Sequence, residues 1–213
     1  HKLEDRPMGV CLISKKEVAV CLWNGTIVIV SFKSIDDVKL VKTLNVRTGF
    51  YFCHSVVKLN SDKLVVSGWN YDYNMLCWGV VSITDGRVDS THYICKGIRT
   101  HLAIKDNTVY ISCWTDESKT TGVYAYDIFN PHTHKFLYQH KELKRPGSIM
   151  AVMDSVFVSD RYSNRIHQLT DSGQLVTIHR VSSRLYGIFY DDQHGVLYTT
   201  SKYRTNVITV YRL

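Results

Sequence analysis

A unit of roughly 45 residues recurs along the chain, and this period constrains the fold more than any other feature of the sequence. Each copy reads as an apolar run, a polar loop that contains an aromatic residue, and a second apolar run. The copies are EVAVCLWNGTIVIV (17–30), KLVVSGWNYDYNMLCWGVV (63–81), TVYISCWTDESKTTGVYAY (108–126), SVFVSDRYSNRIHQL (155–169) and GVLYTTSKYRTNVITVY (195–211). An apolar run precedes every copy across a short turn, and a further strand-like run follows all but the last. The repeating unit is therefore four short strands, A to D.

Four antiparallel strands at this period are typical of a β-propeller blade. No stretch keeps the i, i+3, i+4, i+7 apolar spacing of an amphipathic helix. A β-sandwich rarely shows a period, and a β-helix has a shorter one. We predict an all-β propeller with five blades, forming one domain over residues 1–213. The blades are expected at 7–45, 46–96, 97–143, 144–181 and 182–213.

The two ends of the sequence bear on how the ring would close. The last run, Asn206–Leu213, reads as a C strand with no D strand after it, whereas residues 1–6 resemble the exit from a D strand. Residues 1–6 could complete the fifth blade and remove its exposed edge. Alternatively, an earlier blade has been cut away. The sequence leaves both open.

Charge and cysteine content narrow the expected partners and compartment. Lys and Arg number 26 against 19 Asp and Glu, a net charge of +7, which favours acidic partners such as RNA or acidic peptides. The longest apolar run, 18–32, is broken by Asn24-Gly25, so no membrane association is expected. The six cysteines contain no C-x-x-C pair, which indicates unpaired thiols in a cytoplasmic protein. Cys11 and Cys21 would face each other if their hairpin turned at Lys16.

Blade four, VFVSDRYSNRIHQLTDSGQLV (156–176), resembles the NHL repeat: an apolar strand, an Asp, a loop ending in Asn-Arg-Ile, a second strand and a Gly turn. Blade five is similar, and RPMGVCLISKKEVAVCLW (6–23) resembles the propellers of animal tripartite-motif (TRIM-type) proteins. Blades two and three depart from the motif, with longer B–C loops and no Asn-Arg-Ile. The resemblance implies a propeller of usually six blades that selects the substrate of a ubiquitin ligase or binds RNA.

Antiparallel order places the D–A and B–C loops on one side of a propeller, and these loops carry the candidate ligand-binding residues. An arginine occurs in every D–A connection: Arg6, Arg47, Arg99, Arg145 and Arg184. An aromatic residue is expected just past every strand B: Trp23, Trp69, Trp114, Tyr162 and Tyr203. Further candidates break the repeat: Arg161, Arg165, Lys202, Arg204, and Tyr71 and Tyr73 of an apparent insertion. Guanidinium groups and flat rings can hold phosphates and stack on bases or peptide side chains. Equally, such residues can simply join neighbouring blades.

Catalysis is not expected from this chain. It has no G-x-S-x-G, no phosphate-binding glycine loop and no nucleophile spacing, and strand A offers only His54 and His101 to a central channel. His132 and His134 share a C–D loop but lack a third metal ligand, so neither a metal nor another cofactor is expected. A propeller hydrolase or lyase and a lectin remain as alternatives.

The sequence thus predicts a non-catalytic recognition module, with a protein partner favoured over RNA. Ligase activity would belong to other domains of the parent protein, because no RING cysteine–histidine cluster is present. Oligomerisation through this domain is not expected.

Overall fold

We describe the protein from a computed structural model. The structure describes residues 3–34, 37–46, 49–115, 119–181, 185–191, 193–201 and 208–212. These residues form strands and turns, with no helix among them. The chain divides into two compact units, one ending at Thr100 and the other beginning at His101, and each unit is described by itself.

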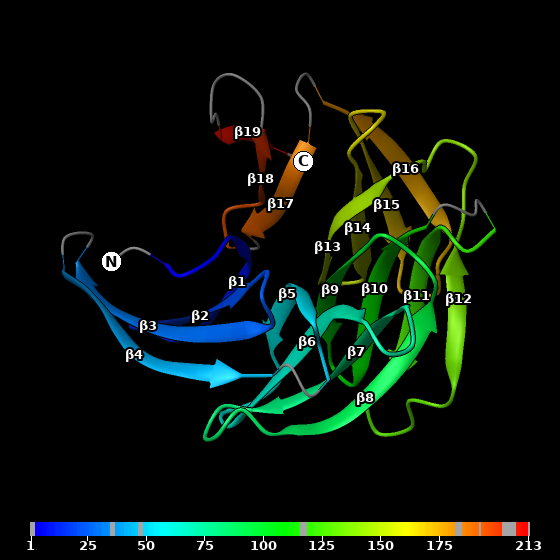
Figure 1. The fold of residues 1–213 in the computed structure, drawn as a ribbon. Helices are drawn as coiled ribbons and strands as arrows, with labels where there is room; N and C mark the ends of the chain where they lie inside the picture. Colours follow the sequence, from blue (N-terminus) through cyan, green and yellow to red (C-terminus); the bar gives the residue numbers. More distant parts are fainter. Residues whose placement is uncertain are drawn as a thin grey trace. The chain divides into compact units, whose positions relative to one another are not determined.

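The first unit holds two antiparallel sheets, each a four-stranded meander (Figure 1). One sheet contains β1 (Pro7–Ser14), β2 (Glu17–Leu22), β3 (Thr26–Ser34) and β4 (Asp37–Asn45). The other contains β5 (Phe52–Lys58), β6 (Lys63–Asn70), β7 (Met75–Ser82) and β8 (Val88–Cys95). Their facing sides share one apolar core that includes Ile27, Phe50, Leu64 and Val66.

The second unit holds the remaining sheets, all of them antiparallel. The third sheet contains β9 (Arg99–Lys105, which begins at the end of the first unit), β10 (Thr108–Trp114), β11 (Gly122–Asp127) and β12 (His134–Tyr138). The fourth contains β13 (Pro146–Val152), β14 (Ser155–Asp160), β15 (Arg165–Thr170) and β16 (Leu175–Arg180). The fifth contains β17 (Leu185–Asp191), β18 (Val196–Ser201) and β19 (Ile208–Arg212).

The burial of the strands follows their place in the meander. Second strands such as SVFVSD of β14 are buried almost throughout, because neighbouring sheets cover both of their faces. Fourth strands such as LVTIHR of β16 are mostly exposed, which fits their outer position. The five successive meanders confirm the predicted all-β, five-bladed propeller. The single domain over residues 1–213 and the closing role of residues 1–6 stay predictions.

Strand A carries a recurrent β-bulge near its start. Register shifts fall between Pro7 and Gly9, between Cys53 and Ser55, between Pro146 and Ile149, and between Leu185 and Gly187. A bulge leaves one residue outside the ladder and re-aims its side chain. His54 and Tyr186 occupy such positions, and both belong to the ligand-binding candidates described below.

One detail of the cysteines differs from the expectation. The register of β1 and β2 places Cys11 opposite Ala19 and Cys21 opposite Gly9, because the turn and the bulge shift the pairing. The two thiols therefore do not face each other directly. No disulfide joins any of the six cysteines, all of which lie in the described part of the chain. Burial raises the pKa of Cys11 to about 11 and the pKa values of Cys21 and Cys77 to about 12.

Candidate functional site

The site in the second unit is organised by the carboxylate of Asp160, at the end of β14. This fully buried carboxylate accepts hydrogen bonds from the backbone N–H groups of Lys144, Arg145 and Tyr162 at 2.8, 3.1 and 2.8 Å, and from the Ser163 hydroxyl at 2.9 Å. The Arg161 N–H also donates to the carbonyl of Arg145 at 3.0 Å. The connection before β13 and the turn after β14 are therefore joined into one rigid element.

This element holds the Arg145 guanidinium between two rings. Its central carbon lies 4.7 Å from the ring centroid of Trp114, the last residue of β10, and 5.3 Å from that of Tyr162. Both distances fall in the range of cation–π attraction. Three predicted site residues from two neighbouring blades thus meet at one point, although they are separated in the sequence. The shared face predicted for the D–A and B–C loops is present here.

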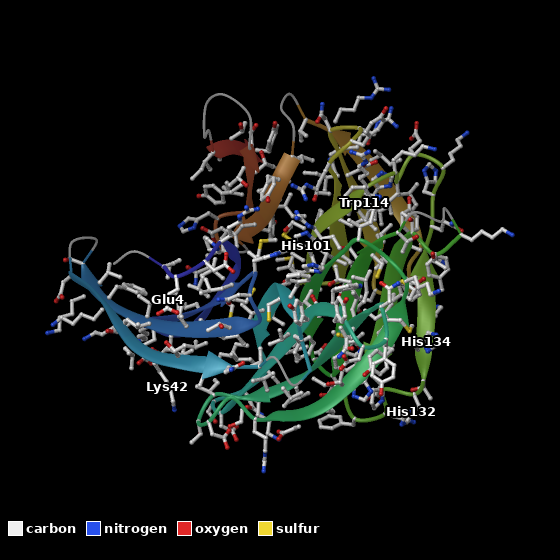
Figure 2. The ribbon with its side chains drawn as sticks, viewed as in Figure 1. Glu4, Lys42, His101, Trp114, His132 and His134 are labelled. Atoms are coloured by element: carbon white, nitrogen blue, oxygen red, sulfur yellow. The ribbon has the colours of Figure 1, made fainter. Side chains whose placement is uncertain are left out.

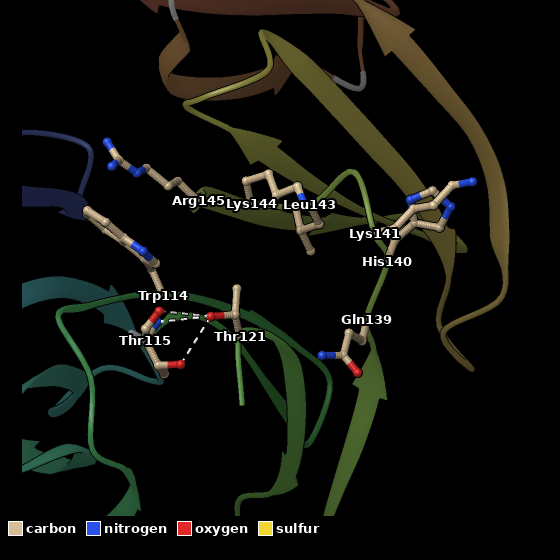
Figure 3. Close-up of a pocket in the computed structure, with 9 residues that line it drawn as sticks. All are labelled: Trp114, Thr115, Thr121, Gln139, His140, Lys141, Leu143, Lys144 and Arg145. Carbon is tan, nitrogen blue, oxygen red and sulfur yellow. Dashed lines mark hydrogen bonds between the residues drawn. The ribbon is translucent and has the colours of Figure 1, made fainter. Parts of the chain in front are cut away.

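A pocket of about 530 Å³ opens beside this stack. Figure 3 shows Trp114 and Arg145 on one side of it and His140 and Lys141 on the other. Lys144 adds another positive charge, and Thr115 and Thr121, joined by hydrogen bonds, complete part of the wall (Figure 3). The charged side chains that line the pocket are cationic, so the pocket suits an acidic group that can also contact an aromatic ring.

A second cation–π pair extends the face toward β17. The Arg161 guanidinium carbon lies 4.0 Å from the ring centroid of Tyr186, the bulge residue. A Cβ added to Gly147 would stand 2.8 Å from the Arg161 side chain, so glycine at that position makes room for it. Tyr162 is the most exposed ring of this face, with 68% of its surface accessible.

Arg165 is engaged differently from Arg161. Its Nη1 lies 2.5 Å from Oε1 of Glu142, and this contact lowers the pKa of the Glu142 carboxyl. In the same sheets, the Tyr138 hydroxyl of β12 and Nδ1 of the buried His167 of β15 form a hydrogen bond of 2.9 Å. Burial lowers the pKa of His167 to about 4 and raises that of Tyr138 to about 12, so both are neutral near pH 7.

The first unit gathers a different set of predicted residues. Trp23 and Trp69 lie on either side of Phe52, and Tyr71 contacts Trp69 edge-on at 5.7 Å. The carbonyl of Arg6 accepts the Trp23 N–H at 2.9 Å, the same bond that joins Arg145 to Arg161 in blade four. Tyr71 and Tyr73 are exposed, whereas Trp23 and Trp69 are half-buried.

Two expectations about the loops were wrong. Trp69 and Trp114 lie at the ends of β6 and β10 rather than past them, because pairing with the next strand extends further than the pattern indicated. The segment Tyr71–Tyr73 is not an insertion. Four residues, 71–74, connect β6 to β7, just as four residues, 161–164, connect β14 to β15. The loop of blade two is thus no longer than that of blade four.

Both turns end on an asparagine in the left-handed region, Asn74 with φ 52° and Asn164 with φ 55°. Asparagine tolerates this conformation better than most residues. Asn70 also takes the place of Asp160, since its side chain donates to the Gly49 carbonyl and accepts the Tyr73 N–H. The pattern N-x-x-x-N in blade two and D-x-x-x-N in blade four would have revealed this equivalence in the sequence.

The remaining predicted residues are not part of either cluster as described. Arg99 opens β9, and Tyr73 packs against Tyr93 of β8 with ring centroids 4.6 Å apart. Five candidates lie outside the described residues: Arg47, Arg184, Lys202, Tyr203 and Arg204. Sequence reasoning missed Phe52, His54, Asp160 and Tyr186, and their only signal was a place next to strand ends.

His132 and His134 lie at the opposite end of their sheet from Trp114 (Figure 2). His134 stacks on Tyr126 with ring centroids 5.3 Å apart. Within the described part of the chain, no group of three His, Cys, Asp or Glu side chains is placed to hold a metal ion. The same residues contain no helix of the length and apolarity needed to cross a bilayer.

No protein-family model and no curated protein matches the chain. Several solved structures do. The chain is similar to a luciferin-regenerating enzyme, with 14% identity, a TM-score of 0.72, and coverage of 94% of this chain and 71% of that one. It is similar to the WD40 β-propeller domain of Doa1, with 13% identity, a TM-score of 0.62, and coverage of 100% and 70%.

A chain of a nidogen/laminin complex is also similar, with 13% identity, a TM-score of 0.64, and coverage of 85% of this chain and 66% of that one. This chain therefore spans about two thirds of the length of that structure. At these identities the likeness shows the fold alone. The protein is a β-propeller, a fold that in general suits a protein-interaction module.

Proposed function

We propose that this chain is a non-catalytic recognition module that binds an acidic segment of a protein partner at the pocket beside Arg145. The observation that carries the proposal is the planar Arg145 cation held between Trp114 and Tyr162, with Lys141, Lys144 and His140 nearby. Trp, Tyr and Arg dominate the binding energy of protein interfaces. A guanidinium already fixed by two rings loses little freedom when it pairs with a carboxylate.

RNA is the alternative partner, and the structure supports it less. Of the four residues expected to contact phosphates, Arg165 is paired with Glu142, and Arg161 lies over Tyr186. Lys202 and Arg204 are outside the described residues. One of the expected cations, Arg165, is therefore already neutralised by a carboxylate within the protein.

The wider role that we propose is substrate selection for a tripartite-motif ubiquitin ligase, in the cytoplasm. The support is the sequence VFVSDRYSNRIHQL together with the turn that Asp160 organises, and six cysteines without a disulfide among them fit that compartment. Ligase chemistry would reside in other domains of the parent protein.

A binding experiment with labelled probes tests the proposal. We would measure fluorescence anisotropy with a decapeptide that alternates Glu and Tyr, a Lys–Tyr decapeptide and a ten-nucleotide oligo(U). We expect the acidic peptide to bind best. Lys141→Ala with Lys144→Ala should weaken its binding at least about tenfold, since two charge-assisted contacts are lost.

Two further variants sharpen the result. Arg145→Lys keeps the charge but removes the planar group between the rings, so we expect it to weaken binding as well. The matched control, Lys15→Ala with Lys16→Ala, removes two exposed lysines of the β1–β2 turn and should change nothing. Tighter binding of oligo(U) than of the acidic peptide, with a steep salt dependence, would favour the RNA alternative. Equal losses from both lysine pairs would refute a defined site.

A further inference from the structure

The first unit contains a second pocket, of about 220 Å³, which the proposed function does not use. It is lined by Trp23, Phe52, His54, Trp69, Gly97 and Ile98. We call the three aromatic rings and His54 the aromatic box. Pockets for drug-sized ligands usually exceed about 300 Å³, so this one suits a single ring with a small substituent.

Local backbone structure explains why these side chains meet. Phe52 pairs with Trp69 across β5 and β6, and the next pairs are Cys53 with Gly68 and Ser55 with Ser67. His54 is therefore the extra residue of a β-bulge, which re-aims its side chain. A Cβ on Gly68 would come within 1.9 Å of the Phe52 carbonyl oxygen, so only glycine allows this close approach.

The rings of the box are nearly parallel. Trp23 and Phe52 stack with centroids 4.4 Å apart and planes 25° apart. Phe52 and Trp69 are 5.6 Å apart, with planes 17° apart. The two tryptophans thus cover both faces of Phe52, so a flat ligand in the pocket meets the edges of this stack and is attracted to them through dispersion and edge-to-face contact.

His54 supplies the polar group of the box. The Thr100 N–H points at His54 Nδ1, with an N···N distance of 3.4 Å, and a backbone N–H can only donate. The imidazole proton therefore resides on Nε2. That Nε2 is buried, and no hydrogen-bond partner for it exists among the residues that the structure describes. A buried donor without an acceptor destabilises the folded protein, and a ligand acceptor would remove that cost.

The charge of the ligand follows from the surroundings. Burial and, to a smaller extent, the nearby positive charge of Arg99 lower the pKa of His54 to about 3, so the imidazole is neutral near pH 7. Arg99 disfavours a cationic ligand, and the Nε2–H donor cannot pair with one. An anion would lose its hydration against three apolar rings, which is costly.

We propose that the aromatic box is a ligand site for a neutral planar group that packs against the ring edges of Trp23, Phe52 and Trp69 and accepts a hydrogen bond from His54 Nε2–H through a carbonyl oxygen. An aromatic carboxamide or a lactam ring has this chemistry. The site differs from the cationic pocket of the second unit in both shape and charge.

A series of ring compounds of similar size tests the proposal. Benzamide presents a neutral carbonyl, benzamidine a cation with donors only, and toluene no polar group. We would titrate each into the whole chain and follow the His54 Nε2–H and Trp indole signals by NMR. We expect benzamide to shift the His54 proton downfield and to bind at least about tenfold more tightly than the other two, the factor expected for one buried hydrogen bond.

Uracil provides a lactam of similar size. Tighter binding of uracil than of benzamide would identify a nucleobase-like ligand, and the reverse would identify a carboxamide. Either outcome supports the site. The proposal would be overturned if benzamidine or toluene bound as tightly as benzamide, or if the His54 signal did not move when benzamide was added.

Two variants localise the effect. His54→Phe should remove the preference for benzamide while leaving toluene binding unchanged. Phe129→Leu, which changes an exposed ring of the other unit, is the control and should change neither. If His54→Phe fails to fold, the ligand series on the unaltered protein still decides the question. Because benzamide, uracil and toluene are uncharged, failure here is distinguishable from failure of the acidic-peptide site.

Discussion

The carboxylate of Asp160 accepts the backbone N–H of Arg145 at 3.1 Å and thereby fixes the residue whose guanidinium lies between Trp114 and Tyr162. The turn after β14 therefore does more than connect two strands, because it holds the Arg145 guanidinium in place. The consequences for stability and for the two candidate sites can be tested separately.

Asp160→Ala should destabilise the protein by about 2–4 kcal/mol, because several partly buried donors lose their acceptor. Asp160→Asn should cost less, since its amide oxygen can keep some of these bonds. Urea unfolding gives both values. Asp154→Ala is the control, because Asp154 is fully exposed and lies 3.7 Å from Lys105, and we expect a change below about 0.5 kcal/mol. Equal effects at the two positions would contradict the role of Asp160.

Gly68→Ala should destabilise the protein much more than Gly147→Ala. The new Cβ at position 68 would lie 1.9 Å from a backbone oxygen, so we expect a loss of about 3 kcal/mol or more. At position 147 the Cβ would meet the Arg161 side chain at 2.8 Å and the Ser159 hydroxyl at 3.0 Å. Both are side chains that can shift, so the loss should stay near about 1 kcal/mol while Arg161 leaves Tyr186. Thermal unfolding measures the first effect, and the Tyr186 ring signals in NMR report the second. Similar stability losses would show that the two glycines are equivalent.

The free energy of unfolding should fall as the pH falls below about 6.5. Burial lowers the pKa of His54 to about 3 and that of His167 to about 4, from an ordinary value of 6.5. Between the folded and the unfolded pKa of each histidine, the unfolded chain binds a proton that the folded chain does not. The contribution of both histidines to the free energy of unfolding is therefore fully present above pH 6.5 and is lost as the pH falls. The slope should reach about 1.4 kcal/mol per pH unit for each histidine.

Urea titrations at pH 7.5, 6.0 and 5.0 would measure this slope, and His167→Gln should reduce it. The exposed pair His132→Gln and His134→Gln should leave it unchanged. A slope that is unaffected by His167→Gln would mean that this histidine is protonated in the folded protein.

Thiol labelling of the native protein should be slow at Cys21, Cys53 and Cys77. All three are buried, and burial raises the pKa of each thiol. The thiolate is the reactive species, so both access and ionisation protect these groups. After unfolding without a reductant, all six cysteines should react with a chromogenic disulfide. A count below six would reveal a disulfide and would argue against the cytoplasmic location.

The period near 45 residues determined the five sheets, because apolar strands and polar turns alternate regularly enough to be read directly. The sequence also pointed to Arg145, Trp114 and Tyr162, which meet in the candidate site. It did not show that blade two has the same four-residue turn as blade four, since longer strands there resembled a longer loop.

Only the tertiary structure decided which of these residues meet. Arg145 reaches Trp114 because Asp160 fixes its backbone from a different strand, and His54 enters the aromatic box because a bulge takes it out of the ladder. Hydrogen bonds and register shifts of this kind join residues that are distant in sequence. The strand pattern is local, set by the alternation of side chains, whereas the sites depend on where single residues leave that alternation.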